Sequence, residues 1–190
     1  MAAKDLWKAD PYHTQFRFSV AHLGVSKVRG HFNEGRVEVR SATENFADAE
    51  VEVVINVASI DTDNPRRDAH LRSKDFFDAK NHPEMIFRST GIRYRDGSHT
   101  FRLEGNLTIR DKTLPIVLEG EYNGKEKGPF GLTHAGFELS THINRFDFGL
   151  SWNKLDEKGV SMVGKEVQIE IELELLPAAE QEGLIKQMEG

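Results

Sequence analysis

The sequence predicts an all-β fold of about eight antiparallel strands, closed into a barrel or packed as a sandwich. Most of the 190-residue chain alternates apolar and polar residues with a period of two. Turn signals such as Asp96-Gly97 separate the alternating segments. Helical patterns are confined to one connection and the C-terminal end. Antiparallel strands with one apolar face must hide that face from water, and a barrel or a sandwich does this.

The alternation defines the residues expected to face the interior. In residues 167–175, five aliphatic side chains alternate with Gln168 and three glutamates. In residues 15–23, Phe16, Phe18, Val20 and His22 share one face. Six further segments with strand character lie at 35–40, 50–57, 85–94, 101–109, 113–122 and 134–143.

Short helices are expected in the connection that follows residue 61. Asn64 before Pro65 is a typical helix start, because proline at the first helical position loses no useful hydrogen-bond donor. A second helical turn is predicted at 73–80, with Ser73 as its cap. We assign residues 1–176 to a single barrel domain and residues 177–190 to a tail with a weak amphipathic helical pattern.

The composition limits the classes of function. There are 25 basic and 31 acidic residues, for a net charge of −6, which argues against nucleic-acid binding. The chain has no cysteine, and no segment is apolar for the roughly 18 residues of a membrane span. The segment MAAKDLWKADPYH lacks the apolar run of a signal peptide, so a cytoplasmic location is expected, with an exported form left open if a leader was removed. Twelve phenylalanines against three tyrosines favour a dry interior.

Motifs of catalytic chemistry are absent from the sequence. There is no G-x-S-x-G motif and no phosphate-binding loop, and the eight histidines form no H-x-H or H-x-x-x-H pair. No metal or cofactor is predicted, although His70, Asp75 and His82 would be the candidates for a metal site. For His22, three interpretations stay open, namely a hydrogen-bonded core histidine, a polar contact in a cavity, or a general base.

The segment RDAHLRSKDFFD, residues 67–78, combines charged residues with adjacent phenylalanines. Its aspartates are typical of helix caps and of ion pairs with the neighbouring arginines. Phe76 and Phe77 point about 100° apart on a helical turn, so at least one should cover an apolar opening. They would either plug the end of the barrel or line a mouth of lipid size.

Several longer motifs point to a known family. WKADPYHTQFRFSVAHLGVSKVRGHF, SIDTDNPRRDAHLRSKDFFDAKNHPEMIFRST, GNLTIRDKTLPIVLE and HAGFELSTHINRFDFGL occur in this order, and together they resemble the YceI-like family from about Trp7 to Leu175. The resemblance implies a lipocalin-like, eight-stranded antiparallel barrel that holds a polyisoprenoid or a similar long amphiphile. No catalytic activity is established for that family as a whole.

Both lines of reasoning lead to one functional prediction, the binding, carriage or storage of a long-chain isoprenoid lipid in the barrel. The candidate ligands are an isoprenoid quinone and a polyprenyl phosphate. The predicted lining is Phe16, Phe18, Val20, His22, Ile60, Leu71, Phe76, Phe77, Phe87, Phe137, Ile143, Phe146 and Phe148. The predicted polar rim is Arg67, His70, Arg72 and Arg145.

Two alternatives remain at this point. The first is an enzyme that acts on an amphiphilic substrate, with His22 or the 67–78 connection supplying acid–base groups. The second is a barrel filled by its own side chains, which would act through its surface or as a homodimer.

Overall fold

The computed structural model describes residues 3–128 and 130–181. Its strands are β1 (Asp5–Ala9), β2 (Gln15–His22), β3 (Ser26–Phe32), β4 (Gly35–Ser41), β5 (Glu50–Asn56), β6 (Ile60–Asp61), β7 (Glu84–Tyr94), β8 (Thr100–Ile109), β9 (Lys112–Lys127), β10 (Thr133–Asn144) and β11 (Val163–Pro177). The helices are the 3₁₀ helix η1 (Val57–Ser59) and α1 (Pro65–Arg72). Every helix in the described ranges is too short or too polar to span a bilayer.

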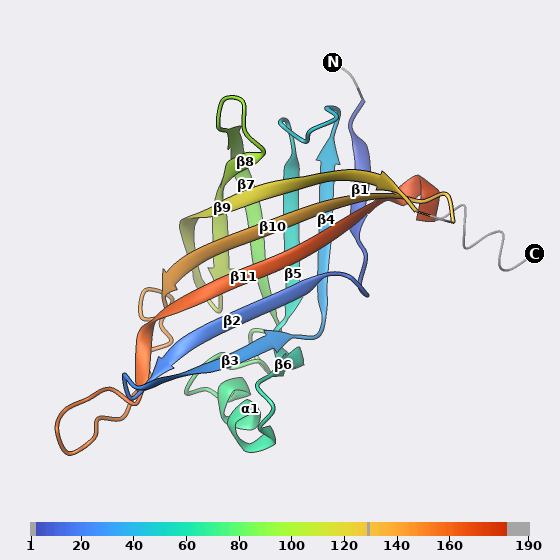
Figure 1. Cartoon of the computed structure of the whole chain (residues 1–190). Coiled ribbons are helices and arrows are strands. Elements are labelled where there is room, and N and C mark those ends of the chain that lie inside the picture. Colours follow the sequence, from blue (N-terminus) through green and yellow to red (C-terminus); the bar gives the residue numbers. More distant parts are fainter. Residues whose placement is uncertain (1–2, 129, 182–190) are drawn as a thin grey trace, which may run out of the picture.

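Eight strands form a closed antiparallel barrel (Figure 1). Hydrogen-bonded neighbours follow the order β1-β4-β5-β7-β8-β9-β10-β11, and β11 pairs with β1 to close the ring. The barrel arrangement removes open sheet edges and surrounds a single interior. This confirms the predicted all-β, eight-stranded antiparallel barrel.

Strand β11 is long enough to pair with two successive strands on one side. Its end at Leu175–Pro177 pairs with β1, and its segment from Val163 to Glu172 pairs with β2. Strands β2, β3 and β6 therefore extend away from the ring, and α1 lies below them in Figure 1. The barrel thus has one end formed by the closed ring and one end bordered by β2, β3 and α1.

All eight predicted strands are present, but β1, β3 and β6 were not predicted. Strand β3 gives a weak pattern because Gly30 occupies one of its inward positions, beside Val28 and Phe32. A Cβ atom at Gly30 would lie 2.6 Å from the Phe18 ring and 2.9 Å from the carbonyl oxygen of Asp61. The glycine therefore permits a close approach between strands. Because glycine has no apolar side chain, it interrupts the alternation by which a strand is predicted.

The connection after β6 holds one α-helix rather than two. The Asn64 side chain accepts a hydrogen bond of 3.0 Å from the Arg67 amide, and Pro65 is the first helical residue, as predicted. The second helical turn predicted at 73–80 is wrong, because residues 74–77 and 79–81 form turns instead. At the C-terminal end, residues 178–181 are helical, and residues 182–190 of the predicted tail lie outside the described residues.

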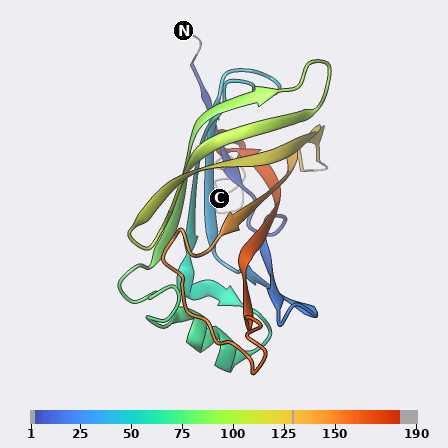
Figure 2. The same ribbon diagram turned by 90° about the vertical axis from the view of Figure 1, so that its left-hand side faces the viewer.

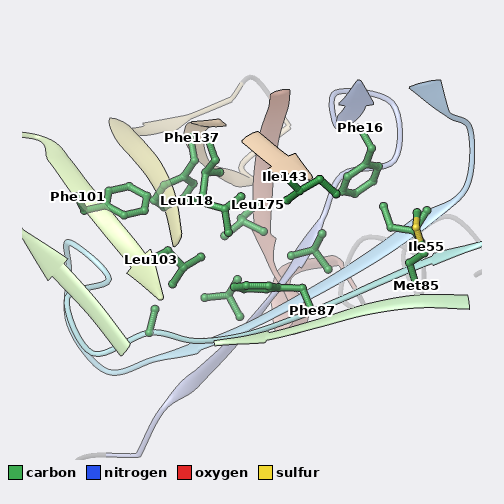
Figure 3. Close-up of a cluster of buried hydrophobic side chains, with 14 of the residues drawn as sticks. Phe16, Ile55, Met85, Phe87, Phe101, Leu103, Leu118, Phe137, Ile143 and Leu175 are labelled. Carbon is green, nitrogen blue, oxygen red and sulfur yellow. The ribbon is translucent and has the colours of Figure 1, made fainter. Parts of the chain in front are cut away.

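The hydrophobic core occupies the barrel interior. Figure 3 shows Phe87 of β7, Phe101 of β8 and Phe137 of β10 directed toward this interior from three different strands. All three side chains are buried. Since the apolar faces of the strands meet inside the ring, the shape of the interior decides what the protein can hold.

Candidate functional site

The barrel encloses an apolar cavity of about 150 Å³, the inner cavity. Side chains from every strand of the closed ring except β1 line it, together with side chains of β2, β3 and the β4–β5 loop. Only two lining residues are polar, Arg17 and Thr141. The Arg17 guanidinium pairs with Glu172, and the Thr141 hydroxyl donates a 2.7 Å hydrogen bond to the carbonyl oxygen of Val117. A cavity of this size with an almost entirely apolar lining stays dry and favours apolar guests.

Aromatic side chains close the inner cavity at the end opposite α1. Trp7, Phe46, Tyr122 and Phe137 form this aromatic plug. The Phe46 ring centroid lies 5.1 Å from that of Trp7 and 5.2 Å from that of Phe137, both in edge-to-face geometry. Edge-to-face packing is a favoured arrangement of aromatic pairs. The plug leaves the α1 end as the route of entry.

Phe46 comes from the β4–β5 loop, and the sequence analysis missed it. Its backbone has a φ of 59°, an unusual value for a phenylalanine, and only 1% of its surface is exposed. The loop is held by Asp48, whose carboxylate accepts hydrogen bonds from the Ser41 hydroxyl and the Ala42 amide. These hydrogen bonds, led by that of Ser41, lower the pKa of Asp48.

A second space of about 760 Å³, the mouth chamber, adjoins the inner cavity at the α1 end. Phe18 lines both spaces and marks their junction. The other walls come from β2, β3, α1 and the loop between β10 and β11, with lining residues Val20, His22, Ser26, Lys27, Val28, Arg29, Asn64, Arg66, Arg67, His70, Leu71, Phe76, Trp152, Met162 and Val163. The inner cavity is therefore almost entirely apolar, whereas the mouth chamber combines a mostly apolar lining with polar and charged residues.

His70 joins α1 to the β10–β11 loop at this opening. Its Nε2 lies 2.8 Å from a carboxylate oxygen of Asp75. Its ring meets Trp152 and Phe76 edge to face, with centroids 4.8 Å and 5.2 Å away. Figure 2 shows α1 and the β10–β11 loop together at the lower end of the barrel. The aromatic contacts and the hydrogen bond with Asp75 give His70 a positioning role in the chamber wall.

The structure places most of the predicted lining residues along the two spaces. Phe16, Phe18, Phe87 and Phe137 line the inner cavity. The mouth chamber includes Val20, His22, Leu71 and Phe76, with Arg67 and His70 of the predicted rim. His22 has neither a hydrogen bond nor an ion pair from its ring among the described residues, so its position is that of a polar group facing a cavity.

Other predicted lining residues are buried beside the cavities. Phe77 packs against the core, 6.0 Å from Phe32 between ring centroids. Ile143 and Phe148 belong to the core, and Ile60 is buried in β6. These side chains support the walls of the two spaces.

The largest differences from the sequence prediction lie at 145–149. Phe146 is 40% exposed and does not line the interior. The guanidinium carbon of Arg145 lies over the Phe146 ring, 4.5 Å from the ring centroid. Arg145 is only 3% exposed and donates to backbone carbonyl groups, so it is not part of a polar rim. The inward residues of β10 are odd-numbered, as Phe137 and Thr141 are, so continued alternation would place Arg145 inside and Phe146 outside. The structure agrees with this parity, although residues 145–149 form a turn.

Arg72 also lies outside the mouth chamber. Its guanidinium is 3.4 Å from the carbonyl oxygens of Ala58 and Ile60, on the other side of α1. Residues five positions apart in a helix point about 140° apart, so Arg67 and Arg72 do not share one face of α1.

Among the described residues, the groups that converge with metal-ligand geometry are Asp10, His13 and Glu174, whose ligand atoms lie within 4.8 Å of one another. His13 Nδ1 lies 3.0 Å from Asp10, and His134 Nδ1 lies 2.7 Å from Glu174. The hydrogen bond to Asp10 raises the pKa of His13. For Asp10, burial acts to raise the pKa, but hydrogen bonds from His13 and the Tyr12 amide hold it below its usual value. This cluster therefore has the charge pattern of mutual ion pairs, and the predicted candidates His70, Asp75 and His82 do not converge as a set.

Comparison with known proteins identifies the class of the barrel and of its site. The chain belongs to the YceI-like domain family, whose model matches residues 7–175. A UPF0312 protein of Azotobacter vinelandii is 32% identical over 174 residues, which cover 92% of this chain and 87% of that protein.

Two solved structures share the fold. BcnA of Burkholderia cenocepacia superposes with a TM-score of 0.75 at 23% identity, covering 87% of this chain and 98% of BcnA. A polyisoprenoid binding domain from Saccharophagus degradans superposes with a TM-score of 0.65 at 11% identity, covering 90% of this chain and 98% of that domain. None of these names states an enzymatic activity.

Proposed function

We propose that this protein binds a long-chain isoprenoid lipid, for carriage or storage, with the tail in the inner cavity and the head group in the mouth chamber. The observation that supports this most is that the two spaces adjoin, with Phe18 in the wall of both. One space is apolar and closed by the aromatic plug, and the other, although mostly apolar, includes polar and charged residues and contains the opening. An amphiphile with one long apolar end has the matching distribution of polarity. The polyisoprenoid binding domain of the same fold supports the same class of ligand.

The energetics favour an extended apolar tail. Each CH₂-sized group that leaves water contributes roughly 0.8 kcal/mol, so one branched isoprene unit outweighs a few imperfect polar contacts. Such a ligand needs a dry cavity of sufficient length rather than a set of reactive groups. This agrees with the absence of catalytic motifs from the sequence.

The dependence of affinity on tail length tests this proposal. We expect geraniol, farnesol and geranylgeraniol to bind with increasing affinity, by at least about tenfold for each added isoprene unit, until the cavity is full. Competition with a fluorescent apolar probe measures the series. Equal affinities, or no binding by any of the three alcohols, would contradict the proposal.

Adjacent residues of β9 provide a matched pair of variants for this assay. Ile116 lines the inner cavity, whereas Val117 is not among the lining residues, since neighbouring side chains in a strand point to opposite faces. Ile116→Trp should reduce the affinity of all three alcohols by filling the cavity. Val117→Trp should leave the affinities of the three alcohols unchanged.

A further inference from the structure

Four titratable side chains gather where β1, β10 and β11 meet, at the seam that closes the barrel (Figure 1). Asp10 and His13 come from the connection between β1 and β2, His134 comes from β10 and Glu174 from β11. None of the four lines the inner cavity or the mouth chamber. The proposed lipid binding therefore gives no physical reason for their convergence.

Two carboxylates face one imidazole in this cluster. Oδ2 of Asp10 lies 3.0 Å from Nδ1 of His13, and Oε1 of Glu174 lies 3.6 Å from the same nitrogen. In the described part of the chain, neither carboxylate has a lysine or an arginine within salt-bridge distance. Asp10 is only 8% exposed, and a buried carboxylate is costly unless a positive charge accompanies it. When His13 is neutral, the two negative charges have the value that a divalent cation balances.

The spacing of these atoms fits the ligands of a transition-metal ion. At metal–ligand distances of about 2.1 Å, neighbouring ligand atoms lie about 3.0 Å apart in octahedral and about 3.4 Å apart in tetrahedral coordination. The ligand atoms of Asp10, His13 and Glu174 lie within 4.8 Å of one another, and two of the pairs, at 3.0 Å and 3.6 Å, are close to these values. The His13 side chain is 62% exposed, so an ion can enter from solvent and keep water in its remaining positions.

Hydrogen bonds outside the set of ligand atoms hold these side chains in place. The Asp10 amide donates a 2.8 Å hydrogen bond to the Glu174 carbonyl oxygen, which fixes the two backbones relative to each other. Oδ1 of Asp10 accepts a 2.8 Å hydrogen bond from the Tyr12 amide, so that Oδ2 is the oxygen beside His13. Nδ1 of His134 lies 2.7 Å from Oε1 of Glu174 and orients that carboxylate. Outer partners of this kind position the ligands of protein metal sites.

We infer that Asp10, His13 and Glu174 bind a divalent transition-metal ion of the Zn²⁺ type. His134 is a positioning residue, because it acts through Glu174. One imidazole with two carboxylates favours this class of ion over Mg²⁺ and Ca²⁺, which prefer oxygen ligands alone. A proton on His13 and a divalent ion serve the same two carboxylates, so the ion pairs of the cluster and the bound metal are alternatives. The metal ties the β1–β2 connection to β11 and stabilises the closed barrel, independently of any lipid.

Titration of the tag-free protein with Zn²⁺, in competition with a chromophoric chelator, tests this inference. We expect a single saturable site and a higher melting temperature in Zn²⁺ than in EDTA, because an ion that binds the native state stabilises it. His13→Ala should lower the Zn²⁺ affinity by more than about a hundredfold, since loss of an outer partner alone costs about 10–100-fold. His142, an exposed histidine that is also on β10, supplies the control, and His142→Ala should bind Zn²⁺ with unchanged affinity.

The visible absorption spectrum of the Co²⁺-loaded protein separates ligands from the positioning residue, because it reports the atoms bound to the ion. His13→Ala should alter this spectrum, whereas His134→Ala should keep it and lower the affinity by about 10–100-fold. His134→Gln keeps a hydrogen-bond donor and should restore most of that loss.

Three results would overturn the inference. The first is the absence of saturable Zn²⁺ binding. The second is an unchanged Zn²⁺ affinity in both His13→Ala and Glu174→Gln, with folding of each variant verified by its melting temperature in EDTA. The third is tighter binding of Ca²⁺ than of Zn²⁺, which would indicate a site of oxygen ligands without the imidazole.

Discussion

Replacing Arg145 with methionine should lower the free energy of unfolding by about 3–5 kcal/mol. The guanidinium is 3% exposed and donates to the carbonyl oxygens of Gly164, Leu150, Trp152 and Val163. Methionine has similar length but no donor, so several buried carbonyl groups would lose their partner, and each unpaired group costs about 1–3 kcal/mol. Urea denaturation followed by tryptophan fluorescence measures the change.

Two further variants calibrate this prediction. Arg145→Lys keeps the positive charge without the planar fork of donors, so we expect an intermediate loss. Arg88→Met removes an exposed arginine whose ion pair with Glu52 contributes at most about 1 kcal/mol. If the free energy of unfolding of Arg145→Met were within about 1 kcal/mol of that of the unaltered protein, the hydrogen bonds from Arg145 to the carbonyl groups would not be important for stability.

Arg145 affects the site indirectly, because it stabilises the β10–β11 loop. This loop supplies Trp152 to the mouth chamber, and Trp152 contacts His70. Burial lowers the pKa of the Arg145 guanidinium. No carboxylate lies within salt-bridge distance of it in the described ranges, so the backbone alone supports its charge. Arg145 thus shapes the opening from within the loop and does not touch the proposed ligand.

A charge at Phe18 should remove lipid binding. Phe18 lies at the junction of the inner cavity and the mouth chamber, 5.6 Å from Phe32 between ring centroids. In Phe18→Asp, an ionised carboxylate would face the path of the tail, and its desolvation opposes entry of the ligand. We expect the affinity for farnesol to fall at least about a hundredfold, since a loss of about 3 kcal/mol suffices for this. The farnesol competition assay measures this change.

The neighbouring residue supplies the control for this variant. Ser19 does not line either space, and its position on β2 alternates with that of Phe18. Ser19→Asp introduces the same charge on the other face of β2, and its affinity for farnesol should not change. Phe18→Leu keeps an apolar side chain at the junction and should also bind farnesol. A folded Phe18→Asp protein that binds farnesol with unchanged affinity would refute this assignment of the lining.

The sequence predicted the regular part of the site because strand alternation has a fixed period. Phe16 and Phe18 of β2, with Ile169 and Ile171 of β11, all line the inner cavity as their alternation indicated. Each of these residues lies on an uninterrupted strand, where neighbouring side chains point to opposite faces.

The rest of the site depends on irregular backbone, which strand alternation does not describe. Phe46 enters the interior from a loop whose shape is set by contacts of Asp48. Phe146 has the opposite parity to the inward residues Phe137 and Thr141 of β10, and in the turn at 145–149 it lies outside. A signal for β3 existed in the spacing of Val28, Gly30 and Phe32, but it requires glycine to be read as an inward residue.

The most direct test of the central claim is mass spectrometry of an organic extract of the protein purified without detergent. We predict a lipid with a long isoprenoid tail in stoichiometric amount. An extract without lipid, obtained again after incubation with prenyl phosphates, polyprenols and quinones, would contradict the account. It would then favour a barrel filled by its own side chains.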